Sequence, residues 1–133
     1  MAGNPQSRAQ QLREYLAQVR ERRFQPGVHD CGTFVAGWVV TATGTLPGGD
    51  WWRGAYRSMK SLDDVMREAG YAGHVEYIAS LLTEIAPAMA MTGDLAVVEG
   101  HAMGIFSGER VFVLRPDGLG HVSRMQAKRA LRV

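Results

Sequence analysis

The stretch His29-Asp30-Cys31-Gly32-Thr33-Phe34-Val35 is the most specific part of this 133-residue chain, and it decides how the first half folds. Asp30 is a residue type that caps helices, because its carboxylate accepts unpaired backbone N–H groups of the first turn. An apolar run follows it and ends at Gly44, which can adopt the left-handed conformation common just past a helix. The stretch therefore predicts a helix over Cys31–Thr43, with the only cysteine of the chain in its first turn.

Cys31 has two interpretations in that position. The N–H groups and the dipole of a helix N-terminus favour a thiolate over a thiol, and the thiolate is the nucleophilic form. The negative charge of Asp30 acts against thiolate formation. The alternative is a small buried core residue, as free cysteines often are. The residues alone leave both interpretations open.

A nucleophilic cysteine needs a base, which is usually a histidine brought close by the fold. The chain has four histidines. His29 is two residues from the cysteine, beyond the expected cap. His74 is expected to face solvent or to cap a helix, and His121 begins a late strand. His101 stands at the turn that opens the apolar run Ala102–Phe106, and it is the candidate base.

Helical patterns surround the cysteine segment on both sides. Leu46–Tyr56, with its adjacent tryptophans Trp51 and Trp52, is expected to be an irregular loop. The further predicted helices are Gln6–Arg23, Leu62–Ala69 with Ser61 as its cap, and about Val75–Ile85.

The second half of the sequence has a different pattern. Short runs rich in Val, Ile and Phe alternate with turn signals such as Ser107-Gly108 and Pro116-Asp117-Gly118, which is typical of an antiparallel meander. The predicted strands are Asp94–Glu99, Ala102–Ser107, Arg110–Leu114 and His121–Arg124, followed by a short helix Met125–Arg129 and a last strand Ala130–Val133. Helices followed by hairpins predict an α+β fold.

Composition limits the remaining classes. A chain of this length is expected to form a single domain over 1–133, and one cysteine excludes both an internal disulfide scaffold and a zinc ribbon. The longest apolar stretch, Phe34–Ala42, is far shorter than the ~20 residues of a membrane span, and the polar N-terminus predicts no signal peptide. Basic residues are concentrated at both ends, but without interleaved aromatics or a nucleic-acid motif, so no nucleic-acid partner is expected.

The cysteine motif resembles a known family. Asp30-Cys31-Gly32-Thr33-Phe34-Val35 at the start of a helix is similar to the Asp-Cys-Ser-Gly signature of the NlpC-type cysteine peptidases. Thr92–Val98, His101–Phe106 and Gly108–Phe112 resemble that family's Gly-Asp-Leu-Val, His-Val-Gly-Ile-Tyr and Gly-Asn-Gly order. The chain is closer still to a small phage-encoded branch, in Phe24-x-Pro-Gly-x-His-Asp-Cys and in the closing Arg129–Val133.

This resemblance implies a papain-like fold and an enzyme that cuts γ-D-glutamyl links to diamino acids in bacterial cell-wall peptide stems. Cys31 would be the nucleophile and His101 the base, with Trp51 and Trp52 as possible walls of the cleft. It implies no cofactor and no metal. Other phage tail or tail-tip proteins would be the partners, a stem peptide the substrate, and the virion tail, assembled in the bacterial host cytoplasm, the location.

The chain also departs from the NlpC pattern in two places, and these departures lead to an alternative hypothesis. The family places its histidine directly before the apolar-Gly-Ile run, at the position of Ala102, whereas His101 stands one residue earlier. The strand that would orient the base, Val111–Leu114, has no polar residue. A catalytically degenerate component of the phage tail is therefore the second hypothesis, and a small α+β protein with a buried cysteine and no chemistry is the third.

Overall fold

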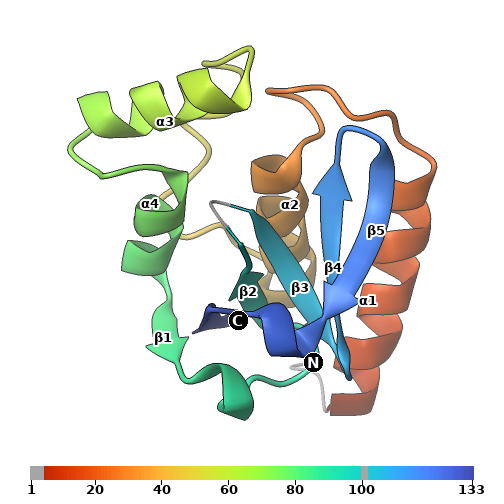
Figure 1. Ribbon diagram of the computed structural model, residues 1–133. Coiled ribbons are helices and arrows are strands. Elements are labelled where there is room, and N and C mark those ends of the chain that lie inside the picture. Colours follow the sequence, from red (N-terminus) through yellow and green to blue (C-terminus); the bar gives the residue numbers. More distant parts are fainter. Residues whose placement is uncertain (1–4, 100–101) are drawn as a thin grey trace.

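The computed structural model describes residues 5–99 and 102–133. These residues form an α+β fold in which helices come first and an antiparallel sheet follows (Figure 1). The helices are α1 (Pro5–Arg20), α2 (Cys31–Thr43), α3 (Met59–Glu68) and α4 (His74–Leu81). The strands are β1 (Thr83–Ile85), β2 (Leu95–Val97), β3 (Met103–Ser107), β4 (Arg110–Arg115), β5 (Gly118–Ser123) and β6 (Arg129–Arg132).

The strands pair in the order β1-β6-β2-β3-β4-β5. Consecutive hairpins join β2 to β5, so the predicted meander is confirmed. The last strand then returns to the other edge of β2, where Leu131 lies opposite Leu95, and β1 pairs beyond it. The meander thus forms the larger part of the sheet. β1, which precedes the meander in the sequence, and β6, which follows it, complete the sheet.

Several predicted boundaries are wrong: the first helix ends at Arg20 rather than Arg23, the strand expected from His121 begins at Gly118, and three further elements differ more. Ser58 caps α3, and Ser61 is the third helical residue, whose hydroxyl accepts the Ser58 backbone N–H in a capping box. The helix predicted over Val75–Ile85 ends at Leu81, because Thr83–Ile85 pairs with β6 as a strand. The helix predicted over Met125–Arg129 is a single 3-10 turn, Arg124–Gln126, and Arg129 already belongs to β6.

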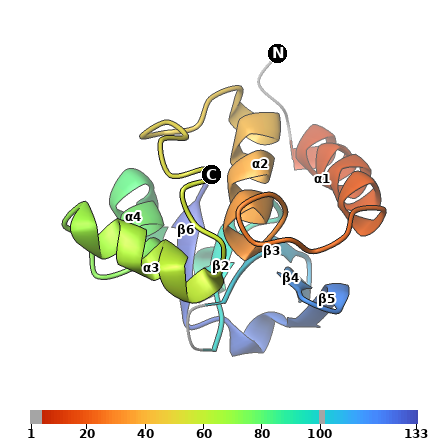
Figure 2. The same ribbon diagram turned by 90° about the horizontal axis from the view of Figure 1, so that it is seen from above.

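The two faces of the sheet are covered differently. Alternate strand residues such as Leu95, Met103 and Ile105 pack with the apolar faces of the helices in the main core. Seen from above, α2 lies between α1 on one side and the pair α3 and α4 on the other (Figure 2). Phe106 and its neighbours on the opposite face form a smaller cluster, where the Arg124 guanidinium stacks 4.9 Å from the Phe106 ring. The helical face therefore carries most of the buried volume.

Helix α2 is the central helix of the main core. Phe34, Val35 and Trp38 are fully buried, and the Trp38 indole donates to the Gly93 carbonyl at 2.7 Å. Gly44 closes the helix in the left-handed conformation, as predicted, with φ of 87°. Within the described residues, no helix is long and apolar enough to cross a membrane.

Candidate functional site

The start of α2 is held by Asp30, which is completely buried. Its carboxylate accepts the backbone N–H of Thr33 at 2.9 Å and of Gly27 at 2.7 Å, and the Tyr56 hydroxyl at 2.7 Å. The Thr33 hydroxyl accepts the Asp30 N–H in return, which completes a capping box. The predicted cap is confirmed, and it fixes Cys31 at the first helical position.

Cys31 is partly exposed and lines a cavity of about 330 Å³. Burial raises the pKa of its thiol to about 12, and the charge of Asp30 adds to the rise. The backbone N–H groups of Met103, Cys31 and Gly32 act in the opposite direction. Of the two interpretations of Cys31 that the sequence left open, this pKa favours the thiol for the protein at rest, because burial and the Asp30 charge outweigh the backbone donors.

His74 lines the same cavity, together with Asp63. It is 4% exposed, so the predicted solvent-facing position is wrong. Its Nδ1 lies 2.7 Å from Asp63 Oδ1, and its backbone N–H donates to the same oxygen at 2.9 Å. Because a carboxylate only accepts, Nδ1 is the ring nitrogen that carries a hydrogen in this contact.

Gly73 makes this arrangement possible. A Cβ at Gly73 would lie 2.9 Å from Asp63 Oδ1, closer than real Cβ contacts come. The glycine thus lets the carboxylate of α3 approach the first residue of α4. The outcome is a histidine oriented by an aspartate, in the same cavity as the cysteine.

The rest of the cavity wall is apolar with two cations. Phe24, Met59 and Leu114 supply apolar surface, and Lys60 and Arg115 are exposed cations that also line it. Ala102, the position that the NlpC resemblance assigns to a histidine, lies in the wall as well. An anionic or peptide-like group fits this combination of an apolar wall and two positive charges.

The other predicted site residues fall elsewhere. His101 lies outside the described residues. Trp52 is buried in the main core, and Trp51 packs edge-on against Tyr77, so neither tryptophan lines the Cys31 cavity. His29 is buried, and it lines a different cavity from that of Cys31.

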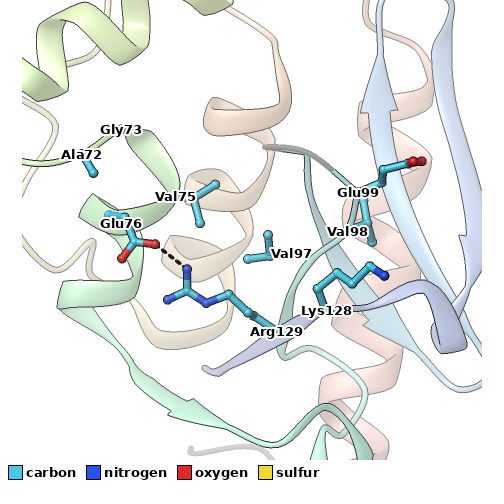
Figure 3. A pocket seen from close by; sticks show the side chains of 9 residues that line it. All are labelled: Ala72, Gly73, Val75, Glu76, Val97, Val98, Glu99, Lys128 and Arg129. Atoms are coloured by element: carbon cyan, nitrogen blue, oxygen red, sulfur yellow. Dashed lines mark hydrogen bonds and ion pairs between the residues drawn. The ribbon is translucent and has the colours of Figure 1, made fainter.

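A separate cavity of about 420 Å³ lies on the other side of the start of α4, between that helix, the end of β2 and the start of β6. Figure 3 shows Glu76 and Arg129 paired on one side of it, with Glu99 and Lys128 on the other. Arg129 also pairs with Glu84. The described residues of this wall include no thiol or imidazole. Within residues 5–99 and 102–133, no group of three or more His, Cys, Asp or Glu side chains is placed to hold a metal ion.

Residues 6–133 match the family model DUF6950, a domain of unknown function. The chain belongs to the DUF6950 family. No curated protein matches it. The matched range of this DUF6950 domain includes Cys31, Asp63 and His74, so the whole cavity lies within it. The family description assigns no activity, and the resemblance to the NlpC peptidases remains a prediction.

The sequence does not predict the Asp63–His74 pair of the DUF6950 domain. The two residues are eleven positions apart, on helices that are joined by a turn, and no periodic pattern links them. The available signal was Gly73 directly before His74, because a glycine at a helix start often marks a close approach by another group. That signal becomes specific only when the two helices are placed.

Proposed function

We propose that this protein is a cysteine-dependent peptide hydrolase with an NlpC-like fold, and that Cys31 is its nucleophile. One observation carries the proposal: Cys31, His74 and Asp63 line one cavity, and Asp63 hydrogen-bonds the ring of His74. A nucleophile, a base and a group that orients the base are the components of cysteine and serine hydrolases on many unrelated folds. His74 takes the role of the base that the sequence assigned to His101.

The high thiol pKa decides how the reaction starts. With a pKa of about 12, Cys31 is a thiol at neutral pH, so its proton must leave as the sulfur attacks. Nε2 of His74 accepts that proton while the Cys31 sulfur bonds to the carbonyl carbon of the substrate. Asp63 stabilises the imidazolium that forms.

The following steps return the enzyme to its starting state. Backbone N–H groups at the start of α2 and at Met103, which already act on the sulfur, are placed to stabilise the oxyanion of the tetrahedral intermediate. The imidazolium gives its proton to the leaving amine, the C–N bond breaks, and a thioester remains on Cys31. Water attacks that thioester with His74 again as base, and the carboxylic acid product leaves.

Cell-wall stem peptides are the substrate class that we propose. The resemblance implies a γ-D-glutamyl link, in which the glutamate keeps a free α-carboxylate on the same residue whose side-chain carbonyl is attacked. Lys60 and Arg115 line the cavity, and the structure gives neither a carboxylate partner among the described residues. They are placed to bind such a carboxylate.

Digestion of purified muropeptides, followed by mass spectrometry, tests the reaction. Wild-type protein is expected to split the stem peptide, and Cys31→Ala is expected to leave it intact. His74→Ala is expected to slow cleavage by about 10²–10⁴-fold, because it removes the base. His121→Ala is the matched control, since His121 is exposed on β5 and should leave the rate unchanged.

His101→Ala in the same assay separates the two candidate bases. Loss of cleavage in His101→Ala with full activity in His74→Ala would move the base to His101 and leave the hydrolase intact. No cleavage by freshly reduced wild type, or full cleavage by Cys31→Ala, would contradict the proposed function.

A second candidate is a catalytically inactive component of the phage tail. The observation that favours it is Ala102, an alanine in the wall of the Cys31 cavity at the position of the family histidine. On this hypothesis, phage particles assembled with the Cys31→Ala protein keep full infectivity across an intact cell wall. On the hydrolase hypothesis, the same particles assemble but cross the wall poorly. Both hypotheses place the protein in the virion tail, in contact with other tail proteins.

A further inference from the structure

A second buried histidine lies in a cavity that the proposed hydrolase does not use. This cavity measures about 180 Å³ and lies between α1, the start of α2 and the loop that follows α2. Tyr15, Arg22, His29, Thr33 and Arg53 are among the residues that line it. Cys31, Asp63 and His74 do not line it, so any ligand there is separate from the proposed reaction.

The cavity carries positive charge without a compensating acid. Arg22 and Arg53 come from segments that are far apart in the sequence, yet both act on the pKa of Tyr15, which places both guanidinium groups near its hydroxyl. Within residues 5–99 and 102–133, neither arginine forms an ion pair. The lining contains no acidic residue, and the adjacent Asp30 is occupied by its own three donors.

His29 adds an unsatisfied polar atom to these charges. It is 4% exposed, and its Nε2 is buried with no hydrogen-bond partner in the part of the chain that the structure describes. The Val19 backbone carbonyl bonds to the ring, which leaves Nδ1 as the nitrogen that donates. Burial and the charge of Arg22 lower the His29 pKa, so at pH 7 the ring is neutral and Nε2 is an acceptor without a donor. Such an atom costs folding free energy unless something donates to it.

We propose that this cavity binds a phosphate group that carries a hydrogen. Arg22 and Arg53 supply guanidinium donors for the charged oxygens, and Nε2 of His29 accepts the P–OH hydrogen. Sulfate has the same shape as hydrogen phosphate and the same two negative charges but carries no hydrogen, so it leaves Nε2 unsatisfied. The chemistry therefore selects phosphate over sulfate.

Titration of the full chain with inorganic phosphate and with sulfate at pH 7.4 and constant ionic strength tests this selection. Calorimetry gives the affinity, and the ring resonance of His29 reports contact at Nε2. Phosphate is expected to bind and to shift that resonance, with sulfate about tenfold weaker or more, the effect of one unsatisfied buried acceptor. Glycerol phosphate is the third ligand. At pH 7.4 this monoester is mostly a dianion without a P–OH hydrogen, so it is expected to bind as weakly as sulfate, and binding as tight as that of inorganic phosphate would overturn the role of His29 Nε2.

Arginine variants test whether phosphate binds in this cavity rather than elsewhere on the surface. Arg22→Gln and Arg53→Gln are each expected to weaken phosphate binding about tenfold, because each removes one charge-assisted contact. Arg20→Gln and Arg57→Gln are the matched controls, since both arginines are exposed nearby and neither lines the cavity. The proposal is overturned if phosphate does not bind, if phosphate and sulfate bind equally, or if the control variants lose as much affinity as Arg22→Gln.

Discussion

His29 and Cys31 are two residues apart, yet they line different cavities with opposite electrostatics. In the Cys31 cavity the histidine is paired with a carboxylate, Asp63. In the other cavity His29 faces Arg22, and no acid lines the wall. The difference shows that a buried imidazole is not one kind of site: its neighbours determine whether it is suited to take a proton from a thiol or to accept a hydrogen bond from a ligand.

Asp30 separates the two regions and influences both. It caps α2 with all of its side-chain bonds directed to Gly27, Thr33 and Tyr56. Its charge raises the pKa of Cys31 on one side and acts in the raising direction on His29 on the other. Substitutions in the two cavities and at Asp30 therefore test whether the contrast is functional.

The largest effect is expected from the carboxylate of the Cys31 cavity. Asp63→Asn keeps the size of the side chain but removes the charge that stabilises the His74 imidazolium, so muropeptide cleavage should slow by about 10³-fold. Asp64→Asn is the control, because Asp64 is an exposed neighbour on α3 that pairs with the exposed Arg67. An unchanged rate in Asp63→Asn would show that the pair is structural.

The next largest effect is expected on stability, at the boundary between the cavities. Asp30→Ala removes the helix cap and leaves the buried Tyr56 hydroxyl and the Gly27 N–H without their acceptor, so the free energy of unfolding should fall by about 3 kcal/mol. Urea denaturation followed by circular dichroism measures it. Asp50→Ala, in an exposed loop position, should change stability little, and an equal loss there would contradict the role of the cap.

Much of the fold could be predicted from local signals. Asp30 and Gly44 marked both ends of α2, because a cap and a left-handed glycine act within a few residues of the helix. The meander was marked by its turns. The β1–β6 pairing could not be predicted, because Thr83–Ile85 meets β6 only through a contact across more than forty residues, and its three residues carry no alternation of their own.

The candidate site could be predicted only where local signals determine it. The position of Cys31 follows from its cap, but its thiol pKa depends on how deeply the whole fold buries it. His74 was misjudged because its burial and its bond to Asp63 arise only when α3 and α4 pack together. The unsatisfied Nε2 of His29 likewise depends on the packing of α1 against α2. Each of these is a tertiary property.

A smaller effect tests the influence of Asp30 on Cys31. Asp30→Asn removes the charge that adds to the rise in the Cys31 pKa, so the pKa should fall below its value of about 12. Because the alkylation rate follows the thiolate fraction, iodoacetamide should then modify Cys31 several-fold faster at pH 8 to 9 than in the wild type. Mass spectrometry over time measures the rate. Asp50→Asn should leave it unchanged, and equal rates in Asp30→Asn and wild type would show that burial alone holds the thiol.

The smallest effect tests the influence of Arg22 on His29. Burial lowers the His29 pKa below its ordinary 6.5, and Arg22 lowers it further, while Asp30 and the Val19 carbonyl oppose both. Folded His29 therefore binds fewer protons than the unfolded chain below pH 6.5, and stability falls as the pH falls through that window. Arg22→Gln removes one cause, so the His29 resonance should titrate at a higher pH, still below 6.5 because burial remains, and stability should fall less steeply with acid. An unchanged His29 pKa in Arg22→Gln would show that Arg22 does not act on the ring. The electrostatic contrast between the two cavities would then lose its main support in the His29 cavity.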